Sequence, residues 1–194
     1  FIPKEKSPGE PRVAATPETV RQFVKAGLSV AVEAGAGTAA FFPGALFTEA
    51  GATLVDCAEG FAAADIVASV EPPPIEDVAR MKRGAILIAL LAPHRNAAHV
   101  HALAAGHISS LAMELIPRTT RAQSMDALSS QASIAGYKAA LIAAARLPRY
   151  FPLLMTAAGT IKPAKVVVMG AGVAGLQALA TAKRLGAVVE VSDI

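Results

Sequence analysis

Residues 166–175 read Val-Val-Val-Met-Gly-Ala-Gly-Val-Ala-Gly, a short β-branched run that leads directly into a Gly-x-Gly-x-x-Gly pattern. The residues that follow are rich in alanine and leucine, so we predict a strand, a tight turn and a helix from about Val173 to Leu185. Gly170 permits the turn, Gly172 lets the backbone approach a phosphate, and Gly175 lets the helix pack closely on the strand. Free N–H groups at the positive end of a helix favour binding of a dinucleotide pyrophosphate there.

A second apolar run, residues 187–191, follows the predicted helix and leads to Asp193. In dinucleotide-binding folds an acidic residue about 20 positions after the glycines bonds the ribose hydroxyls, and its charge favours NAD over the 2′-phosphate of NADP. The alternative is a glycine-rich turn beside an unrelated surface aspartate. The order of strand, glycines, helix, strand and acid favours the dinucleotide site. Its predicted contacts are Gly170, Gly172, Val173, Ala174, Gly175 and Asp193.

Both ends of the sequence predict a longer polypeptide. The chain ends one residue after Asp193, whereas a dinucleotide fold needs further strand and helix units to complete its sheet. At the other end, Ile2-Pro3-Lys4-Glu5 resembles the end of a strand whose beginning is missing. We therefore expect this sequence to be the front portion of a larger protein, and we expect these residues alone to bind NAD weakly or not at all.

The composition is apolar for a domain in water. Of the 194 residues 54% are hydrophobic and 17% charged, and the mean hydropathy is +0.48, which indicates faces that a missing segment or a partner covers. The longest apolar run, residues 85–92, is far shorter than the roughly 20 residues that span a bilayer. We predict a buried central strand there, and no insertion of this chain into a membrane.

Charge and side-chain chemistry exclude further classes of protein. The net charge of +3 is spread along the chain without a basic block, so we predict no nucleic-acid partner. The single Cys57 rules out an intramolecular disulfide and fits a reducing compartment. His94, His99, His101 and His107 fall in one region, but His99 and His101 point to different faces of a predicted helix. No cysteine or acidic residue has ligand spacing to them, so we predict no metal site.

Alternation of strand and helix predicts an α/β fold with two Rossmann-like lobes and parallel sheets. Residues 1–130 would form the first lobe, and residues 131–194 the connecting helix and first βαβ unit of the second, truncated after its second strand. Thr16 is predicted to cap the first helix, which Gly27 ends. The other predicted elements are strands at residues 28–33, 53–55, 66–70, 85–91 and 108–115, and helices at residues 45–50, 96–105 and about 132–147.

A polar segment, residues 118–130, follows the last strand of the first lobe. It holds two guanidiniums, an amide, a carboxylate and several hydroxyls, but no pair of nucleophile and base, so its chemistry is recognition and orientation. A carboxylate beside Arg118 would fix the guanidinium and leave Gln123 and Ser129 free to bind an amide such as a carboxamide. The alternative is a solvated loop with a helix cap at Ser129 or Ser130.

Five stretches of the sequence carry a resemblance that covers essentially the whole chain. They are residues 12–17 (Arg-Val-Ala-Ala-Thr-Pro), 117–118 (Pro-Arg), 121–131 (Arg-Ala-Gln-Ser-Met-Asp-Ala-Leu-Ser-Ser-Gln), 134–138 (Ile-Ala-Gly-Tyr-Lys) and 169–176 (Met-Gly-Ala-Gly-Val-Ala-Gly-Leu). These stretches closely resemble NAD(H)-binding domain I of proton-translocating NAD(P) transhydrogenase, the alpha subunit in bacteria. The resemblance implies that Arg118, Gln123, Asp126 and Ser129 hold the nicotinamide. Arg118 and Asp126 would form an ion pair beside the ring, Gln123 would contact the cofactor, and Ser129 would support the carboxamide.

The resemblance also implies the reaction and the partners. Hydride would pass directly between NAD(H) on this chain and NADP(H) on a separate domain, coupled to proton movement through a membrane domain. Arg118, Gln123 and Asp126 would be its catalytic residues, acting by alignment because a hydride moving between two ring carbons needs no protein acid or base. The family further implies a homodimer, peripheral on the cytoplasmic side of the bacterial inner membrane.

Two other functions remain open from the sequence. The related alanine dehydrogenase has the same two-lobed architecture, and the region of Arg12 binds a substrate carboxylate in that enzyme. Oxidising an amino acid there requires a lysine and a histidine at strand ends, where this sequence has Glu71 and Ala92, although His94 is only two residues away. A protein that binds the nucleotide without catalysis is the second alternative.

Overall fold

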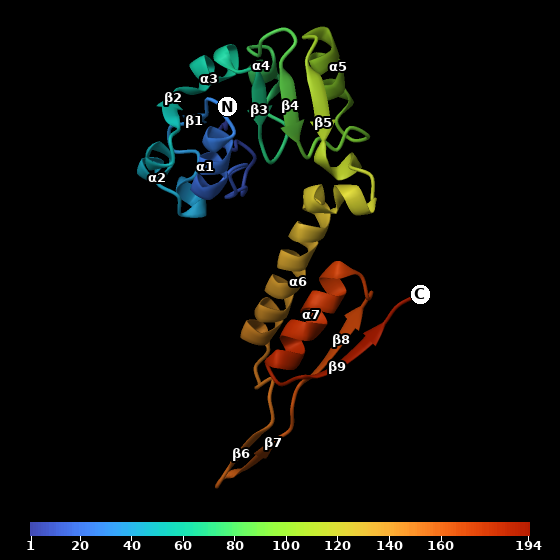
Figure 1. Cartoon of the computed structure of the whole chain (residues 1–194). Coiled ribbons are helices and arrows are strands. Elements are labelled where there is room, and N and C mark those ends of the chain that lie inside the picture. The colour runs from blue at the N-terminus through green and yellow to red at the C-terminus, as the bar shows by residue number, and fades with distance from the viewer. The chain divides into compact units, whose positions relative to one another are not determined.

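The structure is a computed structural model that describes residues 1–194, and its chain forms two compact units, Phe1–Pro117 and Arg118–Ile194 (Figure 1). Both units combine parallel strands with helices, which confirms the predicted α/β class. The polar segment 118–130, grouped with the first lobe from its sequence, lies in the second compact unit.

The first unit is built on two parallel sheets, and the N-terminal residues bridge them through hydrogen bonds. β1 (Ala31–Glu33) pairs with β2 (Thr53–Val55), and β3 (Ile66–Ala68), β4 (Ile86–Ala89) and β5 (Ser109–Ala112) pair in that order. Between β1 and β3 lie residues 1 and 2: the Phe1 amino group donates to the Ile66 carbonyl at 2.7 Å, and Ile2 N–H to Ala31 at 2.9 Å. The extended N-terminus predicted from Ile2 to Glu5 thus provides the central strand position.

Five α-helices accompany this sheet. They are α1 (Pro17–Lys25), α2 (Gly44–Glu49), α3 (Cys57–Ala63), α4 (Ile75–Val78) and α5 (Ala97–Ala105), with short 3₁₀ turns η1 (Thr38–Ala40) and η2 (Met113–Leu115). As predicted, Thr16 caps α1 by accepting from Thr19 N–H at 3.2 Å, and Pro17 follows at the first helical position. Two apolar clusters form the core, one around Val32 and Phe47 and the other around Phe61 and Leu87.

The sequence analysis missed α3 and α4 and was wrong about the end of the last strand. α3 has Gly60 in its middle, which weakens its helical pattern, but a Cβ there would come within 2.2 Å of the Phe1 ring. Phe1 in turn packs edge-on against Phe61, with ring centroids 5.2 Å apart. Residues 113–115 form η2 instead of extending β5, and the Glu114 carboxylate in this turn accepts from the N–H groups of Leu91 and Ala92.

The second unit contains the predicted strand, helix and strand. β8 (Lys165–Met169) and β9 (Val188–Ser192) pair in parallel from Lys165 opposite Val188 to Met169 opposite Ser192, and α7 (Val173–Arg184) connects them. α7 packs against both strands and against α6 (Ala127–Arg146), as Figure 1 shows. This confirms the βαβ unit predicted from residues 166–191.

Two features of the second unit differ from the sequence analysis. α6 begins five residues earlier than the predicted start at Ala132, because Asp126 caps it. The hairpin of β6 (Leu154–Thr156) and β7 (Gly159–Ile161) was not predicted, since prolines before and after it masked two strands of three residues each. No helix in either unit combines the length and apolar character that crossing a membrane demands.

Candidate functional site

The glycine turn between β8 and α7 has the backbone geometry that the sequence predicts. Gly170 has a φ of +101°, in the region that favours glycine, and its N–H donates to the Ser192 carbonyl at 2.7 Å. A Cβ on Gly175 would lie 1.8 Å from the Gly170 carbonyl oxygen, so no side chain fits there. A Cβ on Gly172 would meet no atom within 4 Å, which leaves this side of the turn open to a ligand.

The first turn of α7 presents N–H groups without a capping side chain. Gly172 is the N-cap residue and has no side chain to accept from the turn above it. The N–H groups at the start of an α-helix have no partner within the helix, and the helix dipole adds a partial positive charge at this end. The turn can therefore bind an anionic pyrophosphate through the backbone at Val173, Ala174 and Gly175.

Asp193 lies beside this turn, just after the end of β9. One carboxylate oxygen accepts from Ala171 N–H at 2.5 Å, and the other accepts from Ile194 N–H at 2.8 Å. These hydrogen bonds, that from Ala171 first, lower the pKa of the Asp193 carboxyl, so it is ionised at neutral pH. The sequence placed Asp193 at the ribose position, but its contact with the glycine turn could be found only in three dimensions.

The polar segment forms a 3₁₀ turn, η3 (Thr120–Met125), that leads into α6. Asp126 caps the helix: its carboxylate accepts from Ser129 N–H at 2.8 Å and from the Ser129 hydroxyl at 2.6 Å. The hydroxyl bond first, then the N–H bond, lowers the pKa of the Asp126 carboxyl, and the charge of Arg118 contributes in the same direction. The helix cap is thus Asp126, whereas the sequence offered Ser129 or Ser130 for that position.

The ion pair expected between Arg118 and Asp126 is absent. Both oxygens of Asp126 already accept from Ser129, and no cation comes within salt-bridge distance of them. The exposed side chains of Arg118 and Gln123 make no hydrogen bond within the chain. The structure therefore brings Asp126 and Ser129 together and leaves the guanidinium and the amide of this segment available to another molecule.

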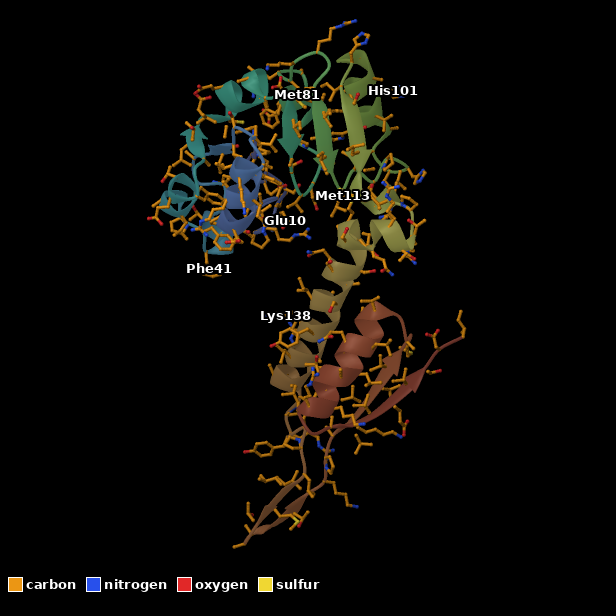
Figure 2. The ribbon with its side chains drawn as sticks, in the orientation of Figure 1. Glu10, Phe41, Met81, His101, Met113 and Lys138 are labelled. Atoms are coloured by element: carbon orange, nitrogen blue, oxygen red, sulfur yellow. The ribbon has the colours of Figure 1, made fainter.

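Near the carboxyl ends of the first unit's strands, charged side chains form hydrogen bonds and ion pairs within the chain. Glu5 accepts from the N–H groups of Val70 at 2.7 Å and Glu71 at 3.2 Å, and burial raises the pKa of its carboxyl despite these bonds. Arg12 donates from Nε to Glu10 at 2.7 Å (Figure 2 labels Glu10). An arginine that could bind a substrate carboxylate thus has a carboxylate of its own chain beside it.

A cavity of about 270 Å³ lies near the same strand ends, next to a buried acid that was not predicted as a site residue. Asp77 is fully buried, and its carboxylate accepts from Lys6 Nζ at 2.5 Å and from the Arg80 guanidinium at 2.5 Å. His99 also lines this cavity and lies 3.0 Å from the Pro73 carbonyl through Nε2. These polar groups connect the segments after the strand ends and fix their conformation.

Neither position 71 nor position 92 has the lysine or histidine that the alanine dehydrogenase reaction was expected to need. Glu71 follows β3, and Ala92, with a φ of +43°, follows β4 in a turn that Glu114 holds through Ala92 N–H at 2.5 Å. His94 is exposed in that turn. No three His, Cys, Asp or Glu side chains gather as metal ligands would.

Comparison with known families covers nearly the whole chain. The N-terminal domain model of alanine dehydrogenase/PNT matches residues 1–135, and the C-terminal domain model of the same family matches residues 139–194. The chain is 49% identical over 199 residues to an NAD(P) transhydrogenase subunit alpha protein of Rhodospirillum rubrum, covering 100% of the chain and 52% of that protein. The alanine dehydrogenase of Mycobacterium tuberculosis is 35% identical over 197 residues, covering 100% of the chain and 53% of that protein.

Solved structures give the same order of similarity. The transhydrogenase from Sinorhizobium meliloti superposes with a TM-score of 0.97 at 47% identity, covering 100% of this chain and 58% of that one. An L-alanine dehydrogenase superposes with a TM-score of 0.85 at 29% identity, covering 98% of this chain and 53% of that one. The chain spans about half the length of the curated relatives it matches. With both domain models matched in sequence order, the chain belongs to the alanine dehydrogenase/PNT family.

Proposed function

We propose that this chain is the NAD(H)-binding component of an NAD(P) transhydrogenase. Hydride passes directly between NAD(H) bound here and NADP(H) on a partner domain, coupled to proton translocation. One observation carries the proposal: the glycine turn, suited to the pyrophosphate of NAD(H), and the capped polar segment, suited to its nicotinamide, belong to the same compact unit. The similarity to transhydrogenase alpha subunits, higher than that to the alanine dehydrogenases compared, supports it.

At the glycine turn between β8 and α7, the pyrophosphate of the cofactor binds the first turn of α7. Gly170, Gly172, Val173, Ala174 and Gly175 provide this surface through the backbone, and Gly172 leaves it open. Asp193 binds the ribose hydroxyls of NAD(H) through its ionised carboxylate, which repels the 2′-phosphate of NADP.

At the nicotinamide end, the chain orients the ring and performs no proton transfer. Gln123 and Arg118 bind the cofactor through side chains that have no partner in the chain, and Ser129 supports the carboxamide. Asp126 holds Ser129 in place by accepting from its N–H and hydroxyl. The nicotinamide supplies the hydride-transfer chemistry when it is bound, and the residues supply proximity, orientation and exclusion of water.

We expect Asp193→Ala to relax discrimination against NADPH, because it removes the charge that repels the 2′-phosphate. Titration of the full-length protein should show the ratio of NADPH to NADH dissociation constants falling about tenfold, which corresponds to about 1.4 kcal/mol. Glu190→Gln is the matched control, since Glu190 is an exposed carboxylate three residues before Asp193, in β9, and pairs with Lys165 at 2.5 Å. An unchanged ratio in Asp193→Ala would place cofactor selectivity elsewhere, and failure of the unaltered protein to bind NADH would refute the proposed function.

The partners follow from the same proposal. The chain works with the NADP(H)-binding and membrane components of the enzyme, peripheral on the cytoplasmic side of a bacterial inner membrane. The relative from R. rubrum is named as a subunit, which supports an assembly of several subunits.

We propose that the chain also pairs with a second copy of itself through the second unit. α6 exposes apolar side chains along its length, among them Ile134, Tyr137 and Ile142, and Figure 2 labels the neighbouring Lys138. The hairpin of β6 and β7 exposes Met155 and Ile161 as well. An apolar surface of this extent marks an interface, and most soluble homo-oligomers form two-fold dimers.

Ile134→Asp tests this interface. Ile134 is 59% exposed in the single chain, so an aspartate costs little there, but an unpaired charge buried in a dimer costs about 3 kcal/mol or more. We expect the dimer dissociation constant to rise at least about a hundredfold, measured by light scattering across a dilution series. Lys183→Asp, on the exposed surface of α7, should leave the dimer dissociation constant unchanged. A dimer that resists Ile134→Asp would exclude this face of α6.

A further inference from the structure

Helices α6 and α7 come into their tightest contact at Gly136. A Cβ on Gly136 would lie 2.0 Å from the Ala174 carbonyl oxygen and 2.8 Å from its carbonyl carbon. Both atoms belong to the backbone of the first turn of α7, so no side chain can rotate away to make room. Gly136 is buried at this contact, and only a residue without a side chain permits the two helices to approach so closely.

Gly136 lowers the intrinsic stability of α6, and the close packing that it permits must compensate for this loss. In the interior of a helix, glycine is about 1 kcal/mol less favourable than alanine, and alanine is the commonest residue of α6. The first turn of α7 is also closely packed at Gly175, where a Cβ would lie 1.8 Å from the Gly170 carbonyl oxygen. The pyrophosphate turn is therefore fixed between its own glycines and Gly136 of α6.

The helix that contains Gly136 also carries the nicotinamide-binding residues at its start. Asp126 caps α6 and holds Ser129 in its first turn, while Gln123 lies one turn before the cap. Ten residues separate the cap from Gly136, which at 1.5 Å per residue is about 15 Å along the axis. One helix therefore connects the segment proposed to hold the nicotinamide with the turn proposed to bind the pyrophosphate.

We propose that Gly136 is a positioning residue that sets the spacing between the pyrophosphate turn and the nicotinamide-binding segment. This inference rests on the proposed function. A methyl group at position 136 must push α6 away from the Ala174 carbonyl, and the start of α6 moves with the helix. The turn itself stays in place, because Gly170 N–H bonds Ser192 at 2.7 Å and Ala171 N–H bonds Asp193 at 2.5 Å.

Two ligands separate this role from a general structural one. NADH must reach both the turn and the nicotinamide-binding segment, whereas ADP-ribose carries the pyrophosphate but lacks the nicotinamide. In the full-length protein with Gly136→Ala, we expect the dissociation constant of NADH to rise about tenfold, because all contacts of the nicotinamide-binding segment are displaced together. The dissociation constant of ADP-ribose should change less than about twofold, because its contacts remain with the turn. Ala139→Gly, exposed on the same helix, is the control for altered helix stability.

The two dissociation constants decide whether Gly136 has a positioning role. A selective loss for NADH in Gly136→Ala, absent in Ala139→Gly, supports the positioning role. Equal loss for both ligands, no loss for either, or the same selective loss in Ala139→Gly would overturn it. If Gly136→Ala is only partly folded, the rise in unfolding temperature with each ligand still reports the two affinities. An unaltered protein that binds neither ligand would instead refute the proposed function, and this inference with it.

Discussion

Replacing Gly172 with alanine will leave the protein folded and remove most of its affinity for NADH. A Cβ at this position meets no protein atom within 4 Å, and the φ of −70° suits alanine, so the free energy of unfolding should change by no more than about 0.5 kcal/mol. The methyl group instead occupies the space through which a phosphate approaches the backbone of the turn. We expect the dissociation constant of NADH to rise at least about tenfold in a fluorescence titration.

Gly175→Ala provides the contrast to that variant. Its Cβ would lie 1.8 Å from the Gly170 carbonyl oxygen, so the chain must shift before any ligand binds. Overpacking of this kind costs about 1–3 kcal/mol, and the variant should lose both melting temperature and NADH affinity. If Gly172→Ala bound NADH as tightly as the unaltered protein, the pyrophosphate would not approach through this turn.

Removing the side chain of Gln123 or Arg118 will slow hydride transfer far more than it weakens NADH binding. These side chains have no partner in the chain, and their proposed role is to align the nicotinamide. Misplacement of a reacting group by about 1 Å can cost on the order of a hundredfold in rate, and we expect losses of that size for Gln123→Ala and Arg118→Ala. The dissociation constant of NADH should rise by less than about threefold in each single variant, because the other nicotinamide contacts and those at the pyrophosphate and ribose remain.

Arg121→Ala is the matched control for this pair. Arg121 is an exposed arginine of the 3₁₀ turn that contains Gln123, with the same charge as Arg118 and no assigned role. Single-turnover rates and NADH titrations on the three variants separate alignment from binding. Equal losses of rate and affinity in Gln123→Ala and Arg118→Ala, or equal effects in Arg121→Ala, would contradict the role given to these two residues.

The sequence predicted the elements whose signals are local. β8, the glycine turn and α7 follow from a β-branched run, three glycines at fixed spacing and an apolar helix, and the first helix follows from Thr16 and Pro17. These residues act on neighbours within a few positions, so their pattern is readable along the chain. The likeness of residues 121–131 to transhydrogenase was also readable in this way.

Features that depend on distant residues could not be predicted. Gly60 lowers the helix propensity of residues 57–63, yet it makes room for the Phe1 ring from another region of the chain. Gly136 gave no sign of its contact with Ala174, and the bond from Ala171 N–H to Asp193 joins residues 22 positions apart in sequence. The ion pair expected between Arg118 and Asp126 is not formed in this structure, where the Asp126 carboxylate accepts instead from Ser129, three residues away.

The most direct test of the proposed function is a hydride-transfer assay on the full-length protein loaded with NADH. NADH oxidation is followed with an NADP-type acceptor held by the partner domain, and separately with pyruvate plus ammonium. We predict oxidation with the partner-bound acceptor and none with pyruvate and ammonium, because positions 71 and 92 hold a glutamate and an alanine. Oxidation by pyruvate and ammonium without the partner would contradict this account and would make the protein an amino-acid dehydrogenase.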